Sequence, residues 1–157
     1  MQELKAWRPK ELIDLMEKNS ITGKVQIAFT EQDILGKPIV HPDIKIANVT
    51  GVGQLVTDEQ TKKTAGTVLI IGEKTQSALS SDSLIKLLGQ YAKVNDPLVV
   101  TVSKGNDRLA AILITGVVQG KDNNEGEIIY LVTATAEKYN FIDENGHLAN
   151  NYMDINE

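Results

Sequence analysis

The sequence predicts an α+β domain dominated by antiparallel sheet, with the strands in a β-sandwich or barrel and helices beside it. One amphipathic helix is followed by three strand-like segments, and short polar turns join these segments. More strand-like segments with alternating apolar residues precede the helix, and a short helix begins the chain. Because parallel neighbours need a long crossover, the last three strands are predicted to form an antiparallel meander.

Length and composition favour one domain with an ordinary apolar core. The chain has 157 residues, no cysteine and a net charge of −5. An acidic balance disfavours nonspecific binding to nucleic acid, and Lys62-Lys63 is the only pair of adjacent basic residues. Disulfides and cysteine metal sites are excluded. No signal peptide or apolar run of membrane-spanning length is present, so we expect synthesis in the cytoplasm and no membrane partner.

Residues 1–20 are predicted to carry a helical arm. Pro9 suits the first helical turn, and a stripe that includes Leu12 and Met16 forms its apolar face. Trp7 comes just before the helix. The favoured interpretation is a terminal helix that covers a sheet edge; the alternative is an arm that anchors onto another subunit.

Strand-like segments follow the arm. Residues 23–30 alternate cleanly, with Val25, Ile27 and Phe29 on one face. Residues 43–50 form the next predicted strand, and 51–57 read as an irregular or bulged one. Residues 58–65 are predicted to be a solvated loop, and 66–73 a short apolar strand.

The central helix is predicted over Ser81–Val94. Ser80 or Ser81 can cap its first turn, and a buried stripe follows the i, i+3, i+4, i+7 spacing. The segment before Pro97 ends the helix, since a residue that precedes proline is disfavoured in the α region. The stripe consists of Leu84, Leu87, Leu88 and Tyr91.

After the helix, residues 97–103 form one predicted strand. Residues 108–118 are apolar on both faces, which indicates a central strand, and 127–139 alternate, with one face in the core and the other partly wet. The tail is polar with scattered apolar residues, which suits a small hairpin or an arm that orders against a partner. The predicted divisions are an arm (1–20), a β domain (21–140) and a C-terminal extension (141–157), with no internal repeat.

No pattern indicates catalysis, a cofactor or a metal. The Gly51-Val52-Gly53 stretch lacks both the third glycine and the helix that a dinucleotide fingerprint requires. His41 and His147 have no second histidine at ligand spacing. Ser103 and Lys104 are adjacent strand residues, whose side chains point to opposite faces and cannot easily form a nucleophile–base pair.

The order of elements from Asn48 to Tyr139 resembles the tail-tube-like fold of phage tail tube, distal tail and baseplate hub (tube initiator) proteins. The resemblance lies in the succession GTVLIIGE, SDSLIKLLGQYAK, DPLVVTVSKGN, RLAAILITGVV and EGEIIYLVTATAEKY. It implies a non-enzymatic virion structural protein that assembles with itself and with neighbouring tail or baseplate proteins. The implied assembly is a ring around a channel through which DNA passes without specific binding. An acidic balance suits such a lumen.

Several residues are expected to contact neighbouring subunits: Trp7, Leu12, Met16, Lys62, Lys63, Phe141 and Tyr152. Two alternatives remain at this stage. One is a small ligand- or peptide-binding β module with a pocket between helix and sheet. The other is an enzyme whose site is assembled from scattered carboxylates.

Overall fold

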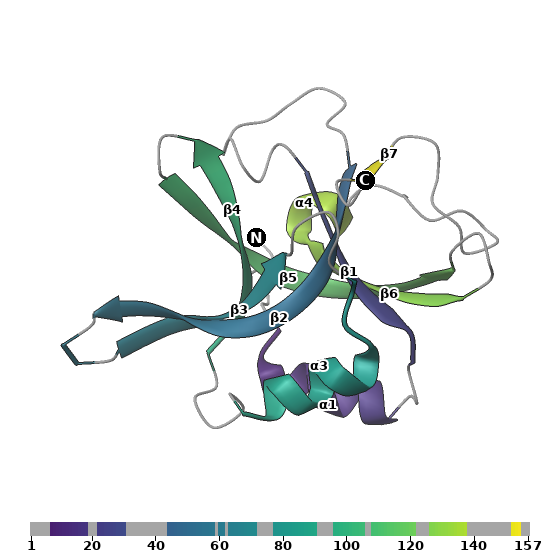
Figure 1. Ribbon diagram of the computed structural model, residues 1–157, viewed down its shortest axis with the longest axis horizontal. Helices are drawn as coiled ribbons and strands as arrows, with labels where there is room; N and C mark the ends of the chain where they lie inside the picture. The colour runs from purple at the N-terminus through teal and green to yellow at the C-terminus, as the bar shows by residue number, and fades with distance from the viewer. Residues whose placement is uncertain are drawn as a thin grey trace, which may run out of the picture.

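A computed structural model of the chain describes residues 7–18, 22–30, 44–58, 60–61, 63–71, 77–90, 96–105, 108–121, 126–137 and 152–154. Helices and strands alternate in blocks along this part of the chain (Figure 1). In order, they are α1 (Pro9–Lys18), β1 (Lys24–Thr30), β2 (Ile44–Asp58), β3 (Lys63–Ile71), α3 (Ser81–Gly89), β4 (Leu98–Gly105), β5 (Arg108–Lys121), β6 (Glu127–Thr133), α4 (Ala134–Glu137) and β7 (Tyr152–Asp154).

The strands form one sheet in the order β1-β6-β5-β4-β3-β2-β7, and an additional pairing of β1 with β2 closes β1 to β6 into a ring. Four pairs are antiparallel (β1–β2, β2–β3, β4–β5 and β5–β6), and three are parallel (β1–β6, β3–β4 and β2–β7). The predicted α+β class with mainly antiparallel sheet is confirmed, as is the meander of β4, β5 and β6. Helix α3 supplies the crossover that the parallel β3–β4 pair needs.

Two long strands turn the corners of the ring. The first part of β2 pairs with β1, and the part from Val49 onward pairs with β3. Likewise, β5 pairs with β4 up to Leu113 and with β6 from Ile114 onward. Each strand has a register shift at this point, between Val49 and Gly51 in β2 and between Ile114 and Gly116 in β5. A bulge bends a strand locally, which lets one strand belong to two differently oriented parts of a sheet.

The same arrangement of one helix and three strands occurs twice. The first half is α1-β1-β2-β3, and the second is α3-β4-β5-β6. In each half the first strand pairs antiparallel with the second, and the second with the third. The first strand of each half pairs in parallel with the third strand of the other. The six-stranded ring is therefore two copies of one topology joined at two parallel seams.

Main-chain hydrogen bonds repeat as well. Trp7, just before α1, donates its N–H to the Ile114 carbonyl at 3.0 Å and accepts from the Leu98 N–H at 2.7 Å. Leu79, just before α3, donates to the Val49 carbonyl and accepts from the N–H of Val25, each at 2.8 Å. Each residue thus sits between the first and second strands of the other half, where the two strands separate.

The registers define equivalent positions in the two halves, and the sequence at the bulges agrees with them. Thr50-Gly51-Val52 in β2 corresponds to Thr115-Gly116-Val117 in β5, and a glutamine (Gln54, Gln119) stands two residues further on in both. The expectation of no internal repeat is therefore wrong. The matching stretches are short and unequally spaced, because the connections between strands differ in length, so a search for one fixed period misses them.

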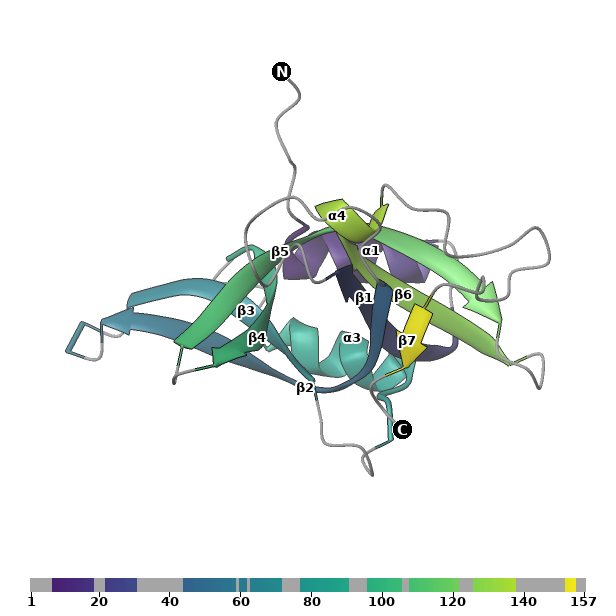
Figure 2. The ribbon, with the colours of Figure 1, turned by 90° about the horizontal axis from the view of Figure 1, so that it is seen from above.

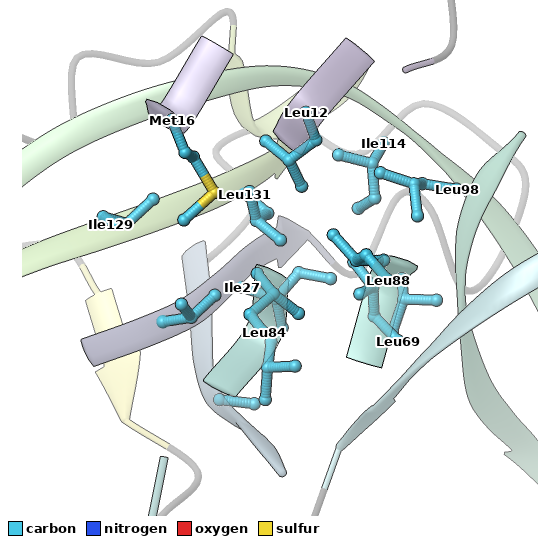
Figure 3. Close-up of a cluster of buried hydrophobic side chains, with 14 of the residues drawn as sticks. Leu12, Met16, Ile27, Leu69, Leu84, Leu88, Leu98, Ile114, Ile129 and Leu131 are labelled. Atoms are coloured by element: carbon cyan, nitrogen blue, oxygen red, sulfur yellow. The ribbon is translucent and has the colours of Figure 1, made fainter. Parts of the chain in front are cut away.

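Helices α1 and α3 lie side by side against one end of the ring (Figure 1). Their buried side chains occupy equivalent positions, since Leu12 matches Leu84 and Met16 matches Leu88. These four side chains pack with apolar residues from the inner faces of the strands (Figure 3). The strand residues of this core are Val25, Ile27, Phe29, Ala47, Val49, Leu69, Leu98, Val100, Ile114, Ile129 and Leu131.

Several local predictions are confirmed. Pro9 begins α1, and the side chain of Ser80 caps α3 by accepting from the Ser83 N–H at 3.2 Å. Leu84 and Leu88 are buried, and Leu87 is half-buried. Tyr91 and the rest of the predicted helix after 90 lie outside the described residues. The bulge predicted in 51–57 is present, within a single strand β2 that joins the two expected strands.

Three predicted strand features need correction. β3 begins at Lys63, so the end of the expected loop 58–65 belongs to a hairpin that extends beyond the ring (Figure 2). β6 ends at Thr133 instead of continuing to 139, because helix α4 begins at the next residue. The Thr133 hydroxyl caps this helix by accepting a hydrogen bond from the Ala136 N–H. Both faces of β6 are buried from Ile128 onward, and neither is partly wet.

Candidate subunit interface

The outer side of the strand ring has two equivalent faces, and one of them is covered. On β1, β6 and the first part of β2, outward side chains form a second apolar cluster with Ala136 of α4. Helix α4 contacts β1, β5 and β6, and lies on the opposite side of these strands from α1 and α3 (Figure 1). The buried residues of this covered face are Ala28, Ile44, Ile46, Ile128, Tyr130 and Val132.

The equivalent face, on β2 to β5, carries the exposed apolar residues. Ile70 is 44% exposed and Leu113 39%. The ladder Gly53–Val68–Val99–Leu113 runs across all four strands, so these residues share one face. None of the described side chains on this face is charged. We call it the uncovered face: Gly51, Gly53, Gly66, Val68, Ile70, Val99, Thr101, Ala111 and Leu113. Of these, Ile70, Ala111 and Leu113 are exposed, whereas Gly66 and Val99 are buried between their neighbours.

Position by position, the two faces differ in what lies over them. Ile70 is equivalent to Val132 on the covered face, which is fully buried beside α4. Leu113 is equivalent to Asn48, whose side-chain carbonyl accepts from the amide of Gln26 at 2.8 Å. At equivalent positions, the covered face therefore has a polar pair and a residue buried beside α4, whereas the other face has the exposed residues Leu113 and Ile70.

Glycines make the uncovered face flat. A Cβ at Gly51 or Gly53 would lie 3.4 or 3.7 Å from the Ile70 side chain, and one at Gly66 would lie 3.1 Å from Val99. The Ile70 and Val99 side chains thus lie across the neighbouring strands where larger residues would lift them. A flat apolar sheet face suits packing against another protein surface.

The uncovered face ends at an open strand edge. β5 residues Arg108–Leu113 pair with β4 on one side, and β6 pairs with β5 only from Ile114 onward. Among the described residues, no strand pairs with the other side of Arg108–Leu113. An unpaired edge presents a row of main-chain donors and acceptors that another strand can use.

Three of the residues predicted to contact neighbours lie in the chain's own core. Leu12 and Met16 are each 1% exposed, and Trp7 is half-buried against the same cluster. In this fold these side chains stabilise the contact of α1 with α3 and the strands. That arrangement agrees with the interpretation of a helix docked on the body, although α1 covers the end of the ring and not a sheet edge.

Of the four remaining predicted contact residues, the structure describes Lys63 and Tyr152. Lys62 and Phe141 lie outside the described residues. Lys63 lies opposite Asp58 in the strand ladder, at the outer end of the β2–β3 hairpin. Tyr152 begins β7 and pairs with Ile44, which places part of the C-terminal extension in the sheet. Lys63 and Tyr152 therefore lie on different strands, β3 and β7, whereas Trp7 and Leu12 lie just before and within α1.

Ile70 and Leu113 were not predicted as interface residues. The available signal was that their segments are apolar on both faces. For 108–118 this pattern was interpreted as a central strand. β5 does have neighbours on both sides, but at different ends, and its Leu113 and Ala111 are exposed. An apolar outer face indicates a partner surface as well as it indicates burial within the chain.

Within the described ranges, no group of three or more His, Cys, Asp or Glu residues could hold a metal ion. His41 and His147 lie outside those ranges. No helix in the described part of the chain has both the length and the apolar character needed to cross a membrane. Comparison with protein-family models, curated proteins and solved structures finds no match to this chain.

Proposed function

We propose that this chain is a structural subunit of a phage or phage-derived tail or baseplate, which assembles through contacts between copies into a ring around a channel. The uncovered face is the observation that carries the assembly. Its exposed Ile70 and Leu113 form part of a flat, uncharged surface across four strands. Such a surface gains most from burial against another protein. The tail or baseplate setting, and with it the virion location, rests on the resemblance of residues 48–139.

The filled interior supports a channel between subunits and none within one. The inside of the strand ring is occupied by buried side chains such as Ile27, Leu69 and Leu131 (Figure 3). A contact between two different surfaces of identical subunits repeats from copy to copy, and it closes into a ring when the rotation permits. The net charge of −5 would keep DNA from binding to the wall of such a channel.

The same filling bears on the alternative of a ligand-binding module. A pocket between helix and sheet needs space there, but Leu12, Leu84 and Leu88 are almost completely buried in that region. The described geometry therefore supports assembly better than ligand binding.

The proposal is tested by the mass of the purified chain across a concentration series. Sedimentation velocity should show association of the wild-type protein, and electron microscopy should show rings. Leu113→Asp places a charge on the uncovered face and should keep the protein monomeric. Gln119→Asp, at an exposed position of the same strand, is the matched control and should assemble like the wild type.

A wild-type chain that stays monomeric at every concentration, or a Leu113→Asp variant that assembles normally, would contradict the proposed interface.

A further inference from the structure

We infer that the open edge of β5 accepts strand β7 of a second copy, which adds in parallel beside Leu109–Ala111. This inference rests on the proposed assembly and names the contact that builds it. The edge lies next to the uncovered face, because Ala111 and Leu113 belong to both. A strand added there would extend the sheet and bring its own subunit against the exposed leucine.

The internal repeat is the reason to expect β7 at this edge. In the first half of the chain, β7 pairs in parallel with Ile44–Ile46 of β2. Ile44 precedes the bulge at Val49 by the same number of residues as Leu109 precedes the bulge at Ile114. The β7 side of Ile44–Ile46 is also the side on which β3 continues, just as the open side of Leu109–Ala111 is the side on which β6 continues. The two edges are equivalent, and one is occupied.

The described part of the chain contains one strand of this kind for two equivalent edges. β7 is only three residues long and follows α4 after residues 138–151. A connection of that length can span roughly 45 Å when extended, which exceeds the roughly 30 Å diameter of a small domain. β7 can therefore reach a neighbouring subunit while α4 stays in place.

Exchange of β7 keeps the number of ladder pairs constant, because each strand leaves one edge and joins its equivalent. The gain comes from the uncovered face, which the neighbour then buries. Since donor and acceptor are different parts of the surface, the contact is head-to-tail and repeats from copy to copy, as a ring of subunits requires.

Engineered disulfides test the contact, and the natural chain has no cysteine to interfere. Met153 pairs with Lys45 in the chain itself, and Ala110 is the position on β5 equivalent to Lys45. In the variant Ala110→Cys/Met153→Cys, mild oxidation should convert the monomer into a ladder of covalent oligomers on a non-reducing gel. The control Gln119→Cys/Met153→Cys and the two single-cysteine variants should give no ladder.

A second variant fixes β7 covalently to β2 of its own chain. In Lys45→Cys/Met153→Cys an intramolecular disulfide should form, and sedimentation should show loss of assembly until the disulfide is reduced. Equal assembly of the oxidised and reduced forms would overturn the exchange of β7.

The outcomes separate the two proposals. If the wild type assembles and Leu113→Asp prevents it, but Ala110→Cys/Met153→Cys gives no ladder, the uncovered face remains an interface and β7 is not what fills the edge of β5. The neighbour then contributes another segment, or the partner is another protein. If the wild type stays monomeric and no ladder forms, both proposals fail.

Discussion

The covered and uncovered faces have the same strand order and the same registers, yet one is buried and the other is partly exposed. Tyr130 and Val132 are buried beside α4, whereas their equivalents Val68 and Ile70 are half-buried and exposed. On the inner side of the ring both halves are mainly apolar, as Leu12 and Leu84 show, although Thr67 is equivalent to Ile129. The comparison shows that strand pairing fixes which residues share a face, but not which face becomes interior.

The inner faces remain mainly apolar because both halves fill one close-packed core. Which residues suit the outer faces depends on what packs over each face. Helix α4 provides that cover in one half. In the other half, glycines at Gly51, Gly53 and Gly66 keep the surface flat.

The largest difference is expected when a carboxylate is placed at equivalent positions of the two faces. Val132→Asp would bury an unpaired charge and should lower the free energy of unfolding by about 3–5 kcal/mol, measured by urea denaturation. Ile70→Asp should cost the monomer much less, about 1 kcal/mol, because this strand residue is 44% exposed, and it should abolish self-association. Similar losses of stability in both variants would mean that Ile70 is buried within the monomer.

Truncation of the core should affect both halves equally. Leu12→Ala and Leu84→Ala each remove a buried side chain at equivalent positions, and each should cost about 2–5 kcal/mol. Lys10→Ala, on the exposed side of α1, serves as the control and should have little effect. If Leu12→Ala leaves stability unchanged while Leu84→Ala does not, α1 is a detachable arm, and the docked position described above does not hold in solution.

Much of the inner architecture was predictable because it rests on local physical rules. The alternation of Val25, Ile27 and Phe29 marked an inner face, and Ser80 and Pro9 marked helix starts. The role of Thr133 was not predictable in this way. The alternation of apolar residues continues past it, and only the tertiary position of Ala136 shows that the chain turns into α4.

The candidate interface was less predictable for a different reason. Burial of an apolar outer face depends on what lies above it, and alternation along a strand carries no such information. The sequence did contain the Thr-Gly-Val-x-Gln match between β2 and β5, but its meaning depends on registers that only the fold reveals.

The polar pair on the covered face offers a sharper contrast with the uncovered one. Asn48→Leu leaves the Gln26 amide buried without its partner at 2.8 Å and should cost about 1–3 kcal/mol. The double variant Gln26→Val/Asn48→Leu copies the residues found at the equivalent positions, Val99 and Leu113. It should recover most of that loss in thermal or urea unfolding, because replacing both partners with apolar groups removes the unsatisfied amide. A double variant no more stable than Asn48→Leu would show that the hydrogen bond is not the reason for the loss.

The smallest effect is expected at the start of α4. The Thr133 hydroxyl accepts from the Ala136 N–H at 3.3 Å, and loss of such a cap costs about 1 kcal/mol. Thr133→Val preserves the volume but removes the hydroxyl, so it should lower the free energy of unfolding by about that amount, whereas Thr133→Ser should retain most of it. Because α4 distinguishes the two faces, Thr133→Val should also speed hydrogen exchange in β1 and β6 more than in β3 and β4. Uniform acceleration across all four strands would indicate a general loss of stability, and α4 would then not be what makes the covered face part of the core.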